Sequence, residues 1–276
     1  MYKSILAISE GGPDAAMSFG LAARIAAMFE GTVDAVHFSE DRADDVNIAA
    51  EALPFLKGVS DLRLKARARD TELAFRDLLA PIAGATFTGG DGVTRQRLVA
   101  MGRYADLVLL GRPGADEENI DPATVRAAIF DCARPVVVAP PVPVAGPIAS
   151  VVVAWNGSAQ AARAVGSALP FLEKARTVTI LVADATPASS PGEIGTPLLL
   201  RNLRRRGIDA AMATMELGAT SGRARGRALI GYVNEKRADL LVMGAYGHGQ
   251  LSNFLGLGGA TAKVIAACPV PLLLAH

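Results

Sequence analysis

The sequence has few of the features that mark secreted, membrane or nucleic-acid-binding proteins. It contains two cysteines in 276 residues, too few to hold a secreted scaffold together by disulfides. No unbroken apolar stretch reaches the ~18–20 residues that a membrane span needs. The formal net charge is +1, without the basic excess typical of dedicated nucleic-acid binders. We therefore expect a cytoplasmic globular protein with neither a membrane nor a nucleic-acid partner.

The chain consists of two copies of one unit. Four segments recur in the same order, displaced by 145–146 positions for the first two and by 133–136 for the last two, so the first copy has the longer middle section. The proline-rich stretch PPVPVAGP lies between the copies, as is common at domain boundaries. We predict a domain at 1–140, a linker at 141–147 and a domain at 148–276. The first match pairs Glu10 with Asn156, within the segments that start at Met1 and Ile148; the other matched segments begin at Thr32 and Thr177, Ala105 and Ala238, and Asp131 and Ala267.

Strand-like and helix-like segments alternate within each copy. Ser158 is placed to cap an alanine-rich helix, and Gly207 is placed to end a later one. The strands are apolar enough to be buried on both faces, as in a parallel sheet with crossover helices. The predicted fold class is therefore α/β, with two tandem doubly wound (Rossmann-like) domains. In the second copy we predict strands at 150–155, 178–182, 210–216, 239–243 and 271–274, and helices at 159–172, 198–206, 223–237 and 261–267.

The two copies differ in charge. Residues 1–146 contain 15 Lys and Arg against 20 Asp and Glu, a net charge of −5, whereas residues 147–276 contain 13 against 7, a net charge of +6. An acidic half joined to a basic half fits mutual docking, and it also fits an anionic ligand in the second half alone. A solvated helix face is a further interpretation, formed by Arg201, Arg204, Arg205 and Arg206.

A glycine-rich segment of the second copy has the composition of a phosphate-binding loop. GAYGHGQLSNFLGLGGAT, residues 244–261, begins directly after an apolar predicted strand and ends where a helix is expected. In open parallel sheets, ligands bind at the carboxyl ends of the strands. Glycines there let backbone N–H groups approach phosphate oxygens, and the N-terminus of the next helix attracts anions. Glycine-rich segments also occur as simple tight turns, so the spacing leaves both interpretations open.

These features together resemble the universal stress protein family, in its tandem-domain form, over essentially the full length of the chain. The resemblance rests on the order of elements, the turn after the first strand, the proline before the last strand, and the likeness of residues 244–261 to the family motif G-x2-G-x9-G-[ST]. It implies that ATP or a related adenine nucleotide, with or without Mg²⁺, lies across the carboxyl ends of a five-stranded parallel sheet. It also implies that the two halves pair through their last strands as an intramolecular pseudo-dimer.

The same resemblance assigns nucleotide contacts to residues of the second copy. The turn that normally holds an aspartate near the adenosine is formed here by Ala154, Trp155 and Asn156. The backbone of Val182 matches the position that reads the adenine edge, and Trp155 is placed either to stack on adenine or to pack in the core. The ribose and phosphate wall and the phosphate loop correspond to Met243, Gly244, Tyr246, Gly247, Gly258, Gly259, Ala260 and Thr261.

Three departures from the family pattern bear on affinity. Asn156 brings no charge, and ten residues instead of nine separate Gly247 from Gly258. Gly259 stands where Ser or Thr is usual, which leaves Thr261 as the hydroxyl nearby. The loss of one hydrogen bond costs ~0.5–1.5 kcal/mol, up to about tenfold in affinity. We expect weakened nucleotide binding.

The first copy departs further from the motif. It keeps Gly111 and Gly114 but lacks the later glycine pair, and Glu10 takes the turn position of Asn156. Carboxylates where phosphates would lie repel them, so we expect this half to be a structural or protein-binding partner. The acidic residues of its loop are Asp116, Glu117, Glu118 and Asp121.

No catalytic residue and no metal site is predicted. No Asp or Glu lies between Gly244 and Thr261, and the three histidines lack ligand-like spacing. We expect a universal stress protein that binds an adenine nucleotide in its second domain and acts as a stress-response or signalling module, with slow or no hydrolysis. The alternative is a nucleotide-independent interaction or dimerisation module that keeps a relic of the motif; an adenylating or hydrolytic enzyme is a third reading. Pairing of whole chains into a homodimer and the identity of a protein partner stay open.

Overall fold

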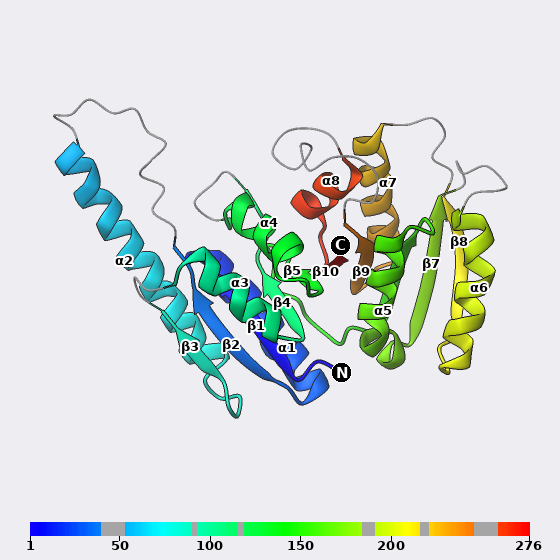
Figure 1. Ribbon diagram of the computed structural model, residues 1–276, viewed down its shortest axis with the longest axis horizontal. Helices are drawn as coiled ribbons and strands as arrows, with labels where there is room; N and C mark the ends of the chain where they lie inside the picture. Colours follow the sequence, from blue (N-terminus) through cyan, green and yellow to red (C-terminus); the bar gives the residue numbers. More distant parts are fainter. Residues whose placement is uncertain (40–52, 90–92, 115–118, 184–190, 216–220, 246–258) are drawn as a thin grey trace.

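The computed structural model describes the chain except residues 40–52, 90–92, 115–118, 184–190, 216–220 and 246–258. Strands and helices alternate through both halves (Figure 1). The elements of the first half are β1 (Ser4–Ser9), α1 (Pro13–Phe29), β2 (Thr32–His37), α2 (Leu53–Leu78), β3 (Thr86–Thr88), α3 (Arg95–Tyr104), β4 (Leu107–Leu110), α4 (Pro122–Asp131) and β5 (Val136–Val138). Those of the second half are β6 (Ser150–Trp155), α5 (Ala159–Lys174), β7 (Thr177–Ala183), α6 (Pro191–Arg205), β8 (Ala210–Met215), α7 (Gly222–Glu235), β9 (Leu240–Gly244), α8 (Ala260–Ala267) and β10 (Leu272–Ala275).

The strands form one ten-stranded sheet in the order β3-β2-β1-β4-β5-β10-β9-β6-β7-β8. Neighbouring strands are parallel except at the centre, where β5 and β10 run antiparallel and Val137 lies opposite Leu273. Each half therefore contributes a five-stranded parallel sheet, and the halves join through their last strands. This confirms the predicted α/β class, its tandem doubly wound domains and the intramolecular pseudo-dimer.

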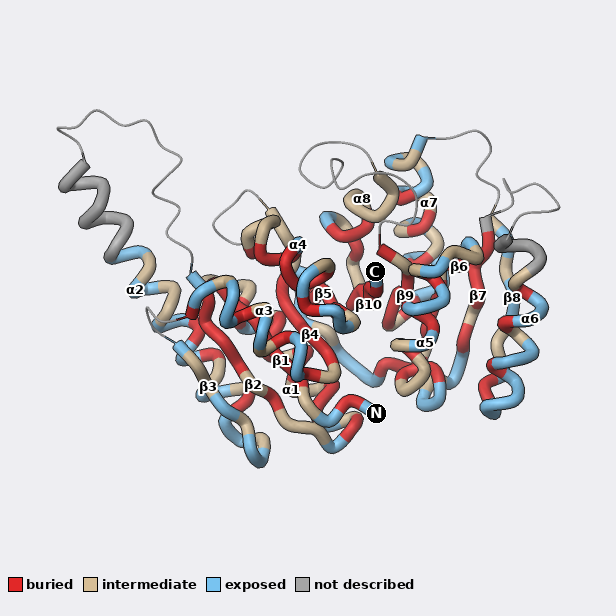
Figure 2. Tube along the Cα trace, viewed as in Figure 1, coloured by how far each residue is buried: buried red, intermediate tan, exposed pale blue. Residues whose placement is uncertain are grey.

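Helices cover both faces of the sheet. Residues of α1, α2, α5 and α6 belong to the hydrophobic cluster on one face, and residues of α3, α4, α7 and α8 belong to the cluster on the other. Figure 2 shows the strands between them as the most continuously buried part of the chain. The prediction that the strands would be buried on both faces is wrong for β3 and β8, whose residues are half-buried or exposed. The reason is that β3 and β8 are the two outermost strands of the sheet.

An aromatic cluster connects the two halves on one face of the sheet. The rings of Tyr2, Phe29 and Phe171 pack against one another with centroids 5.1–5.4 Å apart. Tyr2 also donates its hydroxyl hydrogen to the backbone carbonyl of Ser167. Since Phe29 ends α1 and Phe171 lies on α5, the corresponding first helices of the two copies meet here.

One contact between an aspartate and the backbone occurs at corresponding places in the two halves. In the first half, Asp106 Oδ2 accepts the backbone N–H groups of Lys3 and Ser4 at 2.8 and 3.0 Å. In the second half, Asp239 Oδ2 accepts the two corresponding N–H groups at 2.9 and 2.7 Å. Each carboxylate therefore fixes the start of the first strand of its half.

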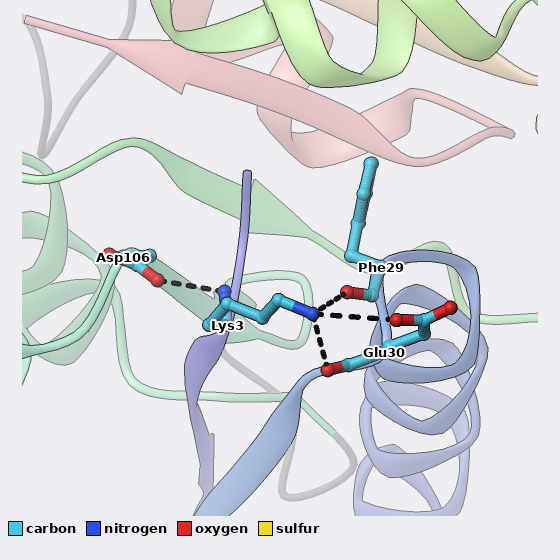
Figure 3. A network of polar contacts seen from close by, with 4 residues as sticks. All are labelled: Lys3, Phe29, Glu30 and Asp106. Atoms are coloured by element: carbon cyan, nitrogen blue, oxygen red, sulfur yellow. Dashed lines mark hydrogen bonds and ion pairs between the residues drawn. The ribbon is translucent and has the colours of Figure 1, made fainter.

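The first half adds a lysine to this contact (Figure 3). Lys3 Nζ donates to the carbonyls of Phe29 and Glu30, both at 2.9 Å, where α1 ends. A cation at this position also favours the negative end of the helix dipole. Lys3 thereby ties β1 to the C-terminus of α1.

The longer middle section predicted for the first copy is a longer helix. α2 has 26 residues, whereas its counterpart α6 has 15. No helix within the described ranges is both long enough and apolar enough to cross a membrane.

Candidate functional site

Five of the predicted site residues meet at the carboxyl ends of three neighbouring strands of the second half. Across β6 and β7, Trp155 lies opposite Val182, and across β6 and β9, Ala154 lies opposite Met243. Gly244 follows Met243 as the last residue of β9. The strand order reverses between β6 and β9, which is where open parallel sheets bind their ligands.

The turn after β6 is organised by Asn156. Its side-chain Oδ1 accepts the backbone N–H of Ser158 at 3.1 Å, an arrangement that Asn favours in turns. Ser158 in turn caps α5, because its Oγ accepts the N–H of Ala161 at 3.2 Å. The Asn156 side chain is exposed, so its amide can donate hydrogen bonds to a ligand.

Trp155 combines core packing with an unused hydrogen-bond donor. The residue is 9% exposed and belongs to the hydrophobic cluster that also includes residues of α6. A Cβ on Gly195 of α6 would lie 3.5 Å from the ring. The indole Nε1 is buried without a hydrogen-bond partner among the described residues. Buried indole N–H groups usually have a partner, so this donor points to a missing acceptor.

Gly244 is required by packing alone. A Cβ at this position would lie 2.6 Å from the backbone nitrogen of Ala161 and 2.8 Å from Cβ of Gln160. The first turn of α5 therefore approaches the end of β9 more closely than any side chain permits. This contact explains the glycine whether or not a phosphate binds near it.

The N-terminus of α8 is open. Gly259 is its N-cap, with extended backbone (φ −101°, ψ 157°), and no side chain of the described residues caps the helix. By contrast, α3, α4, α5 and α7 are each capped by a Thr, Asp or Ser side chain. Ala260 and Thr261, at the start of α8, are half-buried. Tyr246, Gly247 and Gly258 lie outside the described residues.

In the first half, the corresponding helix terminus is occupied. Glu10, the counterpart of Asn156, is 7% exposed. Its Oε1 accepts the hydroxyl hydrogen of Thr124 at 2.6 Å, and its Oε2 accepts the backbone N–H of Asp121 at 3.0 Å. Asp121 is the N-cap of α4 and Thr124 lies in its first turn, so the Glu10 carboxylate lies on the N-terminus of the helix that corresponds to α8.

A second carboxyl group lies beside Glu10. Burial, and next the nearby Glu10 charge, raise the pKa of Asp14 to about 7, against a smaller opposing effect of Arg67 and Arg112. Asp14 Oδ2 is buried and has no hydrogen-bond partner in the described part of the chain. A Cβ on Gly111 would lie 1.6 Å from Asp14 Oδ1, so Gly111 provides the space that this carboxyl group fills.

Helix α2 closes the same end of the sheet. His37, the counterpart of Val182, is 3% exposed, and its Nδ1 lies 2.8 Å from Thr71 Oγ1 on α2. Burial, and to a lesser degree the charge of Arg67, lower the pKa of His37 to about 4. Gly11 (φ +92°) has no room for a Cβ, which would lie 2.5 Å from the carbonyl oxygen of Arg67.

Glu10 and Asp121 could be identified from the sequence, but their contact and the residues around them could not. Asp14, Arg67 and Thr71 were not identified, because they lie on helices whose positions over the strand ends depend on packing. The close approach of Gly11 to Arg67 and the hydrogen bond between Thr124 and Glu10 each join residues that are far apart in the chain.

A groove of about 710 Å³ also lies in this half, between α2 and the ends of β2 and β3. No cluster of metal-ligating side chains occurs among the described residues.

Comparisons with known proteins agree with this architecture. Residues 148–276 match the Universal stress protein family. A universal stress protein from Archaeoglobus fulgidus DSM 4304 has a TM-score of 0.65 at 16% identity, covering 99% of this chain and 96% of that chain. A protein from Pseudomonas aeruginosa UCBPP-PA14, described as a candidate universal stress protein, has a TM-score of 0.56 at 14% identity, covering 99% and 93%. A universal stress protein in complex with cAMP matches 46% of this chain and 97% of that chain at 23% identity, with a TM-score of 0.36. No curated protein matches.

Proposed function

We propose, from the membership of residues 148–276 in the universal stress protein family, that the second half of the chain binds an adenine nucleotide, with ATP as the foremost candidate. The nucleotide lies across the carboxyl ends of β6, β7 and β9, with its phosphates toward α8. In this proposal the protein is a cytoplasmic stress-response or signalling module that holds the nucleotide and hydrolyses it slowly or not at all.

The open N-terminus of α8 carries this proposal. The first backbone N–H groups of a helix have no acceptor within the helix, and together with the helix dipole they favour an anion. Gly259 supplies no capping side chain, so the first backbone N–H groups of α8 can donate to phosphate oxygens. The net charge of +6 on residues 147–276 favours the same ligand.

The other end of the site fits a nucleobase. Nε1 of Trp155, at the end of β6, is a donor with no partner within the described part of the chain, and a ring nitrogen or carbonyl of a base would accept its hydrogen. Val182 lies opposite Trp155 on β7, so both residues lie at the same end of the sheet. We assign Asn156 to the ribose side, because its exposed amide lies at the turn between these groups.

The chemistry of the segment favours binding over turnover. Residues 244–261 contain no Asp or Glu, so the chain offers no carboxylate there to activate a water molecule. Any Mg²⁺ would be held by the phosphates themselves. The residues around α8 bind and orient the phosphates.

An anion placed at α8 tests the proposal. Ala260→Asp puts a carboxylate on the first residue of the helix, where it stabilises the helix but repels phosphate; Ala260→Asn is the neutral control of nearly equal size. We expect ATP affinity, measured by isothermal titration, to fall at least about tenfold in Ala260→Asp and to change little in Ala260→Asn. Titrations with ADP and cAMP identify the nucleotide. Equal affinity of the two variants would refute the assignment of the phosphates to α8.

The nucleotide-independent module is the second candidate, and the packing of Gly244 favours it. Because α5 requires this glycine, part of the motif would persist without any ligand. Mass spectrometry of small molecules released by denaturing the purified protein separates the two. A bound adenine nucleotide supports the first proposal; none released, together with no ATP binding in the presence of Mg²⁺, supports the second.

A further inference from the structure

The two halves differ at the N-terminus of the helix that follows the fourth strand. α4 and α8 occupy corresponding places in the two five-stranded sheets. No side chain among the described residues caps the N-terminus of α8, whereas α4 has its own cap, in which Asp121 Oδ1 accepts the N–H of Ala123 at 2.6 Å. The Glu10 carboxylate is a second acceptor at α4, and it comes from a strand end that is distant in sequence.

Glu10 fills this place as a bound anion would. Both of its carboxylate oxygens accept hydrogen bonds from α4, at 2.6 Å from the Thr124 hydroxyl and 3.0 Å from the Asp121 N–H. The residue is 7% exposed, and its carbonyl oxygen is held by Arg67 Nε at 2.7 Å. Ionised acceptors form the stronger class of hydrogen bond, and they gain further from a helix dipole.

The surroundings have the character of an anion site. Arg67 and Arg112 act on the charge of Asp14, and Glu10 raises the pKa of the same carboxyl group. The four side chains therefore form one electrostatic group at the carboxyl ends of β1 and β4. The Oδ2 atom of Asp14 is buried within this group and has no hydrogen-bond partner among the residues described.

We propose that Glu10 is a tethered ligand: its carboxylate occupies the anion site of the first half, at the N-terminus of α4, and closes that site to soluble anions. The first half is thereby held permanently in an anion-filled state, and the chain binds at most one nucleotide, in the second half. The stoichiometry rests on the function proposed above, whereas the anion site of α4 does not.

Chemical rescue tests the anion site without a nucleotide. Glu10→Ala removes the equivalent of one acetate molecule from the full-length chain, and Glu10→Gln keeps the size but loses the charge. Melting temperatures are compared in sodium acetate and in sodium chloride at equal ionic strength and pH 7. We expect acetate to raise the melting temperature of Glu10→Ala by at least about 2 °C beyond chloride, and to have no such effect on the wild type or on Glu10→Gln. An equal response of all three proteins overturns the proposal.

If Glu10→Ala does not fold, the proposal is tested by amide hydrogen exchange in Glu10→Gln. The N–H of Asp121 then loses its ionised acceptor, and we expect it to exchange at least about tenfold faster than in the wild type; an unchanged rate overturns the proposal. Nucleotide stoichiometry of the wild-type chain separates this inference from the proposed function. One nucleotide per chain supports both, two per chain overturn the closed first half, and none overturns the proposed function while the acetate result stands.

Discussion

Asp14 couples the stability of the first half to pH, and the substitution Asp14→Asn isolates this coupling. The carboxyl group lies at the start of α1, fills the space above Gly111 and has a pKa of about 7, raised from 3.8 chiefly by burial. Between these two values the unfolded chain has released the Asp14 proton and the folded chain still holds it. The free energy of unfolding therefore falls as pH rises from about 4 to about 7 and levels off above.

The size of the effect follows from the shift. About three pKa units correspond to about 4 kcal/mol at ~1.36 kcal/mol per unit. Asp14 is half-buried as a whole residue, and the N-terminus of α1 favours its charged form, so we expect about 2–4 kcal/mol. Asn cannot ionise, and Asp14→Asn should therefore be more stable than the wild type by this amount at pH 8 and nearly equal to it at pH 4.

His37 makes the comparison with the wild type essential. Its lowered pKa means that the unfolded chain binds a proton below about pH 6.5 while the folded chain stays neutral to about pH 4. As pH falls from about 6.5 to about 4, His37 therefore lowers the free energy of unfolding, whereas Asp14 raises it over nearly the same range. The two slopes oppose each other, and only the difference between variant and wild type reports Asp14.

Urea unfolding at several pH values measures this difference. Far-UV circular dichroism follows the whole chain, whereas fluorescence of the one tryptophan, Trp155, follows the second half. Asp70→Asn, which removes an exposed carboxyl group from α2, controls for the loss of one charge. A constant difference between Asp14→Asn and wild type from pH 4 to pH 8 would show that Asp14 is not protonated in the folded protein.

Two further substitutions test the glycines of the two halves. Gly259→Ser restores the hydroxyl that the family motif has at this position; a Cβ there has open space, with its nearest neighbour at 3.9 Å. Titration should therefore show ATP affinity raised up to about tenfold, with stability changed by only a few tenths of a kcal/mol. Gly111→Ala places a methyl group on the Asp14 carboxyl group and should cost about 1–3 kcal/mol in urea unfolding, whereas Gly20→Ala, in open space on α1, should stabilise by about 0.5–1 kcal/mol. Additivity of Gly111→Ala with Asp14→Ala would contradict the contact.

Features encoded locally or by repetition could be predicted from the sequence. The apolar runs, the cap at Ser158 and the internal repeat predicted the alternating elements. The elements predicted for the second half lie close to their observed positions except α6, which begins at Pro191 and not at the predicted residue 198. The exposure of β8 could not be predicted in this way, because it depends on the strand's place at the end of the sheet and not on its composition.

The contacts at the strand ends of the first half could not be predicted, because they depend on how segments distant in the sequence pack together. Glu10 was predicted to take the turn position of Asn156, but its hydrogen bonds to Asp121 and Thr124 join residues more than a hundred positions apart. The approach of α2 to Gly11 and the space above Gly111 are likewise results of helix packing. In the second half, the meeting of Trp155 with Val182 followed from parallel pairing of successive strands, which the pattern of elements already implied.

The antiparallel junction of β5 with β10 has a consequence for how this chain can change. In an assembly of two identical subunits, a substitution in one is a substitution in both, so a carboxylate that fills one site fills its twin. Here two gene segments encode the two sides of the junction, and the tether makes their pairing independent of protein concentration. Each half can therefore diverge while the other keeps its residues. Two identical subunits could not have Glu10 in one site and Asn156 at the equivalent position of the other.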